Sequence, residues 1–444
     1  MRGLLRMAPV GLALAFCALP AAAQSMIDVY RMALDSDPKF RAARYEYRAS
    51  EQVLEQARAA YWPTARADFE RMRTRQRVIS SNNPICGPGL TEFPTDTDTI
   101  SITQPIFRKD LIERIGQAKA QVRQSHFTML AAEQDLMQRT AAAYLAVLAA
   151  RDSLELARAE KETVRKQLDN AETRLKRGLG TITNFHDASA RFSVDEAREI
   201  EAENKLADAR EALKEIIGRD LPAFQRVRDD LPLVLPQPAD PEQWVQRAVD
   251  QNLALKAREE AVVVAQQEIE RQRAGHFPQL NLVGNQNRRD AGSTLFGGGS
   301  TVETQDITLR LSVPIFEGGL TSALTQEAVE RHMKAKEDRE LERRSVERQT
   351  RAAFKSLVSG VNLVRALRQS VESQQNALEG KELGVQRGVF TLLVVLDAQR
   401  DLFIARRDYA QARYDYLLNT LRLKQAAGTL AEDDLLGVNA ALQQ

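Results

Sequence analysis

Apolar residues recur at alternating spacings of four and three positions along two long stretches of this chain. Neither stretch contains a proline: one lies between Pro105 and Pro222, and the other runs from Pro314 to the C-terminus. A narrow apolar stripe of this period, broken here only by Lys161, is typical of helices that pack side by side as in a coiled coil. In the first stretch it comprises Ala150, Leu154, Ala157, Val164, Leu168, Ala171 and Leu175, and then Ala202, Leu206, Ala209, Leu213 and Ile216.

The two stretches predict very long helices. Lys109 to Arg177 and Gly319 to Arg387 each cover 69 residues, or about 100 Å at 1.5 Å per residue. Glycine accepts the left-handed backbone at a helix C-terminus, so Gly178-Leu179-Gly180 and Gly388-Val389 predict hairpin turns into a returning helix. A further helix is expected over residues 27–61, ending at Trp62-Pro63.

Four other segments predict β-strands. The clearest has Ile307, Leu309, Leu311 and Val313 in alternation with polar residues, which gives a strand one apolar face. Loops rich in turn-forming residues, Ser80–Asp96 and Asp290–Thr304, separate the members of each strand pair. The other three strands are expected around Ile100 and Ile102, around Leu280 and Leu282, and over Thr64–Ile79, which carries Arg71, Arg73, Arg75 and Arg77.

The same elements occur twice, at an offset of 210 residues. Tyr144 corresponds to Phe354, and a Pro-Ile-Phe segment precedes each long helix. The chain is therefore an internal duplication. It divides into a signal peptide (1–23), a first repeat of helix, two strands and long helical hairpin (24–221), a proline-rich linker (222–242), a second repeat (243–430) and a C-terminal tail (431–444).

The N-terminus predicts export. Arg2 and Arg6 precede an apolar run and then Ala21-Ala22-Ala23, a small-residue cleavage site. Cleavage after Ala23 removes two arginines and no acid, which changes the formal charge from +1 to −1. A chain without a basic excess is a poor candidate for binding nucleic acid. Cys86 is then the single cysteine, so no intramolecular disulfide can form.

The motifs of common enzymes are absent from the sequence. The four histidines are scattered and lack metal-ligand spacing. There is no phosphate-binding loop of the Gly-x-x-x-x-Gly-Lys type and no Gly-x-Ser-x-Gly nucleophile motif. We therefore predict no catalytic residue, no cofactor and no metal site. Acidic runs such as Glu199-Ile200-Glu201 are interpreted as solvated helix faces.

The strand count points to an assembly. Four amphipathic strands cannot close a membrane barrel, because outer-membrane barrels need at least about eight. Open strand edges are not tolerated in lipid, so several chains must pool their strands. Helices of about 100 Å attached to such a barrel would form a tube on one side of the membrane.

At this point the chain resembles the TolC-type outer membrane channels of Gram-negative bacteria. The resemblance covers Ile27 to about Leu430. It rests on Tyr61-Trp62-Pro63, the two Pro-Ile-Phe segments, Arg177-Gly178-Leu179 with Thr181-Ile182-Thr183, and Arg387-Gly388 with Thr391 and Val395-Leu396-Asp397-Ala398.

The resemblance implies an α+β fold: long antiparallel helical hairpins form a periplasmic α-barrel, and a homotrimer contributes four strands per chain to a 12-stranded barrel among the outer membrane lipids. It implies an exit duct for a tripartite efflux pump or a type I protein secretion system. The implied partners are a periplasmic adaptor protein and an inner-membrane transporter of the ABC, RND or MFS type.

The resemblance also assigns candidate sites to the hairpin tips. Those for adaptor docking are Gly178, Leu179, Thr181, Gly388, Val389 and Thr391. In the family a tyrosine and an arginine bound to an aspartate close the periplasmic entrance; the matching positions here are Val385, Phe390 and Asn184, which cannot form that link. One of two entrance aspartates is replaced by Val394 and the other is retained as Asp397, so closure by Phe390, Val394 and Leu393 is expected.

Two alternatives stay open. A lipid-anchored efflux channel of the same fold would need an acylated Cys17, which bulky Phe16 precedes. An envelope coiled-coil protein without a channel would explain the helices and leave the strand pairs without a purpose. The sequence does not separate drug cargo from secreted protein, nor does it identify the pump.

Overall fold

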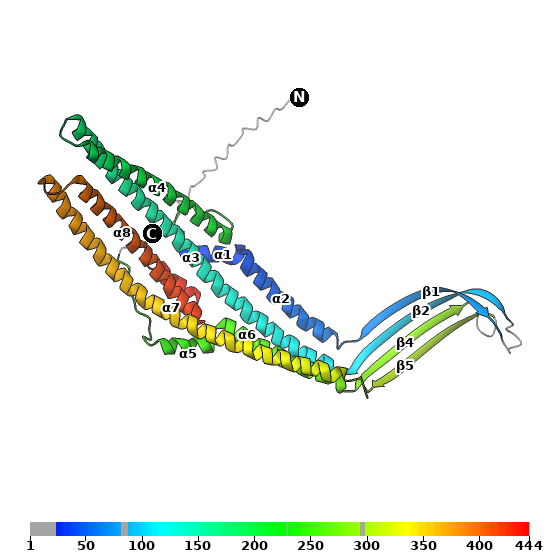
Figure 1. The fold of residues 1–444 in the computed structure, drawn as a ribbon. Coiled ribbons are helices and arrows are strands. Elements are labelled where there is room, and N and C mark those ends of the chain that lie inside the picture. The colour runs from blue at the N-terminus through cyan, green and yellow to red at the C-terminus, as the bar shows by residue number, and fades with distance from the viewer. Residues whose placement is uncertain (1–23, 81–87, 229, 294–297, 444) are drawn as a thin grey trace, which may run out of the picture.

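The computed structural model describes residues 24–80, 88–228, 230–293 and 298–443 (Figure 1). The molecule is elongated, with the long helices gathered in one body and a curved sheet extending from one end of it. The predicted signal peptide, and with it Cys17, lies outside the described residues, as does Cys86.

Two long helical hairpins make up most of the helical body. The first helix of each hairpin, α3 or α7, begins and ends within one residue of its predicted limits. Helix α3 contains 68 residues, which corresponds to a length of about 100 Å. Shorter helices α2 and α6 lie along the sheet-proximal halves of α3 and α7 (Figure 1). The bounds are α2 Pro38–Ala59, α3 Lys109–Lys176, α4 Ile182–Ile217, α6 Leu253–Arg273, α7 Leu320–Gln386 and α8 Leu392–Ala426.

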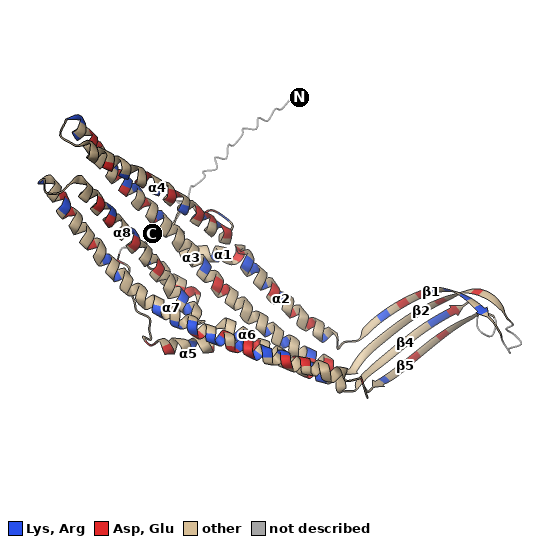
Figure 2. Cartoon of the chain, viewed as in Figure 1, with Lys and Arg blue, Asp and Glu red and all other residues tan. Residues whose placement is uncertain are grey.

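The predicted apolar stripe is buried where the hairpin helices meet. Leu154, Val164 and Ala171 of α3 are buried, as are Leu206 and Leu213 of α4. Lys161, which interrupts the stripe, forms an ion pair with Glu199 instead. Away from the seams, acidic and basic residues alternate along the helix surfaces (Figure 2). Among the described helices, none is long and apolar enough to cross a membrane.

Four strands form one antiparallel sheet in the order β1-β2-β4-β5. Residues opposite each other in such pairs share a face, and the register gathers the apolar residues on one side. Strands β1 and β5 are the two edges. The bounds are β1 Thr64–Val78, β2 Gly89–Phe107, β4 Gln279–Ala291 and β5 Ser300–Ser312, and the apolar face comprises Ala65, Ala67, Phe69, Ile100, Ile102, Leu280, Leu282, Ile307, Leu309 and Leu311.

The strands extend further than the sequence predicted. Gly89–Asp96 belongs to β2, and Ser300–Thr304 belongs to β5, although both were expected in loops. Backbone pairing explains the difference: Val78 pairs with Gly89, and Ala291 pairs with Ser300. These strand ends cover no core and contain threonine, proline and charged residues, so the sequence shows no alternation of apolar and polar residues there.

The first helix is two helices. We expected one element over residues 27–61, but α1 (Met26–Ser36) ends before Pro38, and α2 starts there. Proline is favourable as the first residue of a helix and disfavours helix in the residue before it. The Asp37 side chain caps α2 by accepting a 2.9 Å hydrogen bond from the Phe40 N–H.

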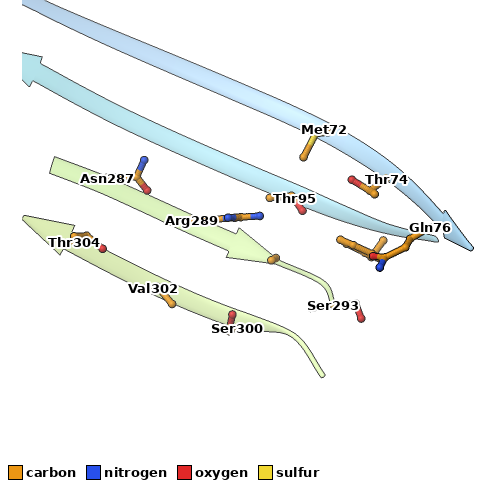
Figure 3. Close-up of a pocket in the computed structure, with 12 residues that line it drawn as sticks. Met72, Thr74, Gln76, Thr95, Asn287, Arg289, Ser293, Ser300, Val302 and Thr304 are labelled. Carbon is orange, nitrogen blue, oxygen red and sulfur yellow. The ribbon is translucent and has the colours of Figure 1, made fainter. Parts of the chain in front are cut away.

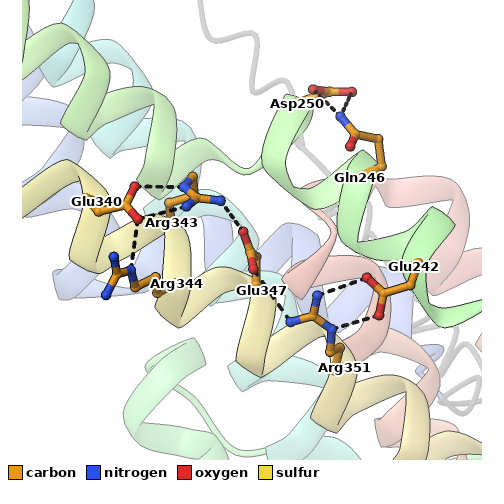
Figure 4. A network of polar contacts seen from close by, with 8 residues as sticks. All are labelled: Glu242, Gln246, Asp250, Glu340, Arg343, Arg344, Glu347 and Arg351. Atoms are coloured by element: carbon orange, nitrogen blue, oxygen red, sulfur yellow. Dashed lines mark hydrogen bonds and ion pairs between the residues drawn. The ribbon is translucent and has the colours of Figure 1, made fainter.

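Several short elements pack against the long helices. The C-terminal segment, for which the sequence predicted no element, contains α9 (Glu432–Asn439) and β6 (Leu442–Gln443), and β6 pairs with β3 (Arg226–Val227). Helix α5 (Pro241–Gln251) is joined to α7 by Arg351, which donates two 2.9 Å hydrogen bonds to Glu242 (Figure 4). The one-turn 3-10 helix η1 spans Ala274–His276.

Candidate functional site

Both hairpin tips are built by the same backbone motif. Gly178 and Gly388 have φ values of 70° and 76°, the left-handed region that glycine adopts without steric cost. The next N–H groups, of Leu179 and Val389, donate 2.8 Å bonds to the carbonyl groups of Arg174 and Gly384. This is a Schellman ending, which uses carbonyl groups that the helix end leaves unpaired.

The tip residues predicted for docking divide into two kinds. Leu179 and Val389 are 69% and 70% exposed, so both tips present apolar side chains to their surroundings. Thr181 has a local role, because its hydroxyl accepts a 3.3 Å bond from the Asn184 N–H at the start of α4. Thr391 occupies the same position before α8 without such a bond.

The residues predicted for the entrance lie at the same end of the molecule. Phe390 is half exposed and packs over the last turn of α7. Val385 packs beside a cluster that includes Leu378 and Leu402, inside its own hairpin. Val394 is half-buried, and an Asp397 carboxylate oxygen lies 3.7 Å from the Arg400 guanidinium, with both side chains partly exposed. Closure of a pore by these residues would require other copies of the chain, so the entrance roles stay predictions.

The two hairpins touch near their tips. Leu396 of α8 is 2% exposed and joins Val164, Ala171 and Ala188 of the first hairpin in one apolar cluster. Asp397 follows directly. The first and second repeats are therefore coupled one turn from the entrance residues.

A cluster of buried charges was not predicted from the sequence. Glu160 of α3 and Asp195 of α4 are buried side by side, and the Arg198 guanidinium lies 3.3 Å from each carboxylate. Burial, and next the charge of Asp195, raises the pKa of Glu160 to about 6. Burial also raises the pKa of Asp195. One feature of the sequence could have indicated this charge cluster: the apolar stripe is interrupted at Lys161, the residue after Glu160.

The sheet carries a polar hollow on the face opposite its apolar residues. The hollow has a volume of about 700 Å³, and Figure 3 shows side chains from all four strands around it. On the same face, the Asn287 side chain donates a 2.9 Å hydrogen bond to the Thr99 hydroxyl, and the Asn285 side chain donates a 2.9 Å hydrogen bond to the Asp306 carboxylate. Its lining includes Thr74, Gln76, Thr95, Asn287, Arg289 and Thr304. The sheet is thus concave and polar on one side and apolar on the other.

Comparison with known proteins decides the family. The family described as "Outer membrane efflux protein" matches residues 29–219 and 244–429, once for each predicted repeat. The chain belongs to the outer membrane efflux protein family. It is therefore an outer membrane channel of efflux and type I secretion systems, a non-enzymatic class of transport protein, with its helices in the periplasm.

Individual relatives of this efflux protein cover nearly all of it. It is similar to "Outer membrane protein TolC" of Vibrio cholerae serotype O1, with 32% identity over 95% of this chain and 94% of the relative. It is also similar to "Alkaline protease secretion protein AprF" of Pseudomonas aeruginosa, with 31% identity over 94% and 86%. The solved CmeC outer membrane channel of Campylobacter jejuni shares the fold, with a TM-score of 0.78, 14% identity and coverage of 99% and 97%.

These findings confirm the predicted fold class. Long helical hairpins, four antiparallel strands and two repeats are the architecture of the efflux protein family.

Of the described residues, none form a cluster of histidine, cysteine and acidic side chains that could hold a metal ion.

Proposed function

We propose that three copies of this chain assemble into one channel that spans the outer membrane and continues through the periplasm. The open sheet edges support the proposal. The large sheet of each chain has four strands, with β1 and β5 unpaired on their outer sides, whereas barrels in lipid must close. Three chains would supply the 12 strands that the resemblance implies, and their concave polar faces would line a common lumen.

The exposed apolar residues of the sheet support its placement in lipid. Ile307, Leu309 and Leu311 are 84%, 64% and 63% exposed on β5. A sheet that displays such residues on its convex side, and polar groups around a hollow on the other, matches the outward-apolar, inward-polar pattern of a membrane barrel.

The two helical tips are proposed as the docking surface for a periplasmic adaptor protein, which in turn contacts an inner-membrane transporter of the ABC, RND or MFS type. Leu179 and Val389 are the supporting observation, because both are exposed apolar residues at the end far from the sheet. The glycines at 178 and 388 and the threonines at 181 and 391 would shape the tips around them. Membership of a tripartite system follows from the family.

The similarity to AprF, which is named for alkaline protease secretion, supports secreted protein as one cargo. Membership of the "Outer membrane efflux protein" family supports drug efflux as the other candidate function. Deleting the gene in its host and assaying both exported protease and drug sensitivity separates the two. Loss of protease export with unchanged drug sensitivity would assign the chain to protein secretion.

The oligomer and the channel have direct tests. Cross-linking in mild detergent should give a trimer, and the purified protein should conduct ions in planar bilayers. Monomers alone in the first experiment, or no conductance in the second, would contradict the proposal. The predicted division into signal peptide, two repeats, linker and tail belongs to the same proposal; N-terminal sequencing of the exported protein tests the cleavage after Ala23.

A further inference from the structure

The arginines of β1 lie on the outward face of the sheet. Arg71 pairs with Asp96 and lies on the same face of β1 as Ala65 and Ala67, which pair with Ile102 and Ile100. Strand β1 starts beside α2 and runs away from the helices, so these arginines occupy its far half (Figure 1). Because the helices are periplasmic, this half lies toward the cell exterior, above the apolar part of the sheet. The row comprises Arg71, Arg73, Arg75 and Arg77, and all four are exposed.

Two of the four have acidic partners within the chain. The Arg71 guanidinium binds Asp98 at 2.6 Å and lies 3.5 Å from Asp96, while Arg75 forms an ion pair with Glu92. These carboxylates on β2 are therefore already neutralised.

The other two arginines face residues that cannot neutralise them. Arg73 stands opposite Pro94, and Arg77 stands opposite Leu90. Among the described residues, no side chain forms an ion pair with either. The sequence of residues 81–87 and 294–297, which lie outside the described ranges, contains no acidic residue. Arg73 also borders a surface hollow of about 370 Å³, together with Arg75, Glu92 and Pro94.

Charge on this face is separated rather than in excess. Four of its five arginines lie on β1, and the tip of that strand is blue in Figure 2. The acids lie on the other strands, and Glu303 lies 3.7 Å from Arg288 of β4. Asp290 is the acid without a described ion-pair partner, and it stands on β4, two strands from Arg71.

We propose that Arg73 and Arg77 bind the phosphate groups of an anionic lipid in the outer leaflet. A guanidinium presents a planar fork of donors that fits a phosphate through two hydrogen bonds. The two arginines lie four residues apart on one strand, about 14 Å at 3.4 Å per residue, at the level where headgroups follow the acyl chains. The proposal rests on the outer-membrane location of the chain and does not require that Arg73 or Arg77 contribute to conductance.

The test uses the full-length mature protein in maltoside micelles, titrated with lipid A and followed by native mass spectrometry. The test variant is the double substitution Arg73→Gln with Arg77→Gln. The matched control is Arg66→Gln, which removes an arginine of the same strand from the opposite, polar face. We expect the double variant to lower the affinity for lipid A by about tenfold or more, and Arg66→Gln to leave the affinity unchanged.

Two further arms identify the ligand. Lipid A stripped of phosphate should bind the wild-type protein as weakly as intact lipid A binds the double variant. A large excess of inorganic phosphate should not displace lipid A from the wild-type protein. Complete displacement by inorganic phosphate would assign the arginines to free anions and overturn the proposal. Equal losses in the double variant and in Arg66→Gln would overturn it too, because the effect would then be general electrostatic attraction.

The neighbouring subunit offers one other partner. If its β5 neutralises Arg73 through Glu303, the double variant will weaken the heat-resistant oligomer on gels and leave lipid A affinity unchanged, which contradicts the proposal. Conductance of the double variant in bilayers separates this proposal from the channel function. A conducting variant with lost lipid affinity supports both, whereas a non-conducting wild-type protein would count against the channel alone.

Discussion

The ring of Phe390 lies against the α-carbon of Gly384, six residues earlier in the chain. A Cβ atom at position 384 would stand 2.3 Å from the Phe390 Cδ2 atom, closer than atoms can approach. The first hairpin has the reverse arrangement at the equivalent positions, 210 residues earlier. There the large residue is Arg174 in the helix, and the glycine is Gly180 after the turn, 3.2 Å from the Arg174 Cβ atom when given a Cβ of its own. Gly384 thus makes room for the Phe390 ring, whereas Gly180 allows the turn to lie against the backbone and the Cβ atom of the preceding helix.

The substitution Gly384→Ala should displace Phe390 from its position on α7. We expect it to lower the free energy of unfolding by about 1 kcal/mol, because the clash exceeds the gain of about 0.5–1 kcal/mol that alanine brings to a helix. Chemical unfolding in detergent measures this. Gly380→Ala is the matched control, since a Cβ at 380 meets nothing within 4 Å, and it should stabilise the protein. Equal effects of the two substitutions would show that Phe390 does not need the space.

Leu179→Asp should abolish transport without disrupting the oligomer. Leu179 is 69% exposed in a tip that no other described element covers, so a carboxylate there costs little stability. An adaptor that packs against this apolar residue would lose its contact and would have to bury a charge. Export assays in the host, with the oligomer checked on gels, measure the effect.

The control for this experiment is Ile200→Asp, which places the same charge on an exposed apolar residue of α4, 56% exposed and more than one helical turn from the tip. It should transport normally. Unchanged transport by Leu179→Asp would restrict the tip residues to forming the turn.

Asp397→Asn should reduce the preference of the channel for cations. Three copies of this carboxylate around a narrow entrance would attract cations by their charge. Asp401→Asn is the matched control, because Asp397 and Asp401 both lie beside Arg400, at 3.7 and 3.1 Å, one turn apart on α8. Reversal potentials in bilayers under a salt gradient measure the selectivity. If both substitutions change it equally, the effect comes from Arg400 and not from a ring of Asp397.

Leu309→Arg should destabilise the membrane-inserted protein by about 2–4 kcal/mol if the residue lies near the bilayer midplane. Thr308→Arg, one residue away on the polar face, should be tolerated. Unfolding in lipid vesicles compares the two, and equal costs would place both faces in similar surroundings. Asp306 lies on the polar face within β5, where its carboxylate accepts a hydrogen bond from Asn285. Asp306→Leu therefore removes a contact in the polar face.

Periodic features of the fold were predictable from the sequence. Leu154, Val164 and Leu213 are buried because a heptad stripe can face only one way once two helices pack. Gly178 and Gly388 locate the turns because their left-handed backbone excludes most other residues. These positions depend on local geometry, which the sequence records directly.

Other features depend on tertiary contacts that have no local pattern. The pairing of β3 with β6 joins residues more than 200 positions apart, and neither segment has a strand period. Gly89 starts a strand only because Val78 is across from it. Glu160 reads as one more surface acid until α4 and α8 cover it. The break between α1 and α2 was also missed, although here the sequence does carry a local signal: Pro38 and the capping residue Asp37.

Glu160→Gln should stabilise the protein at neutral pH and remove part of its pH dependence. The pKa of Glu160 is raised from 4.5 to about 6 by burial and by Asp195, so the folded state holds this proton more tightly than the unfolded state. The contribution of Glu160 to stability is therefore most favourable below pH 4.5, falls as the pH rises to about 6, and stays lower above it. The loss corresponds to about 2 kcal/mol. Thermal unfolding at a series of pH values should show this slope in the wild-type protein and a smaller one in the variant.

The charged groups around Glu160 determine how much pH dependence remains in Glu160→Gln and which control variant is informative. Asp195, Arg191 and Arg198 face it from α4, and Arg407 of α8 lines the same hollow of about 200 Å³ with Arg198. Asp195 also has a raised pKa, so a smaller slope of the same sign should persist. Glu199, whose pKa is lowered by Lys161 and Arg158, gives the opposite sign: its stabilisation is present at neutral pH and is lost as the pH falls. Glu199→Gln should therefore destabilise the protein at pH 7. If both substitutions shift stability in the same direction at that pH, the burial of Glu160 does not control its charge.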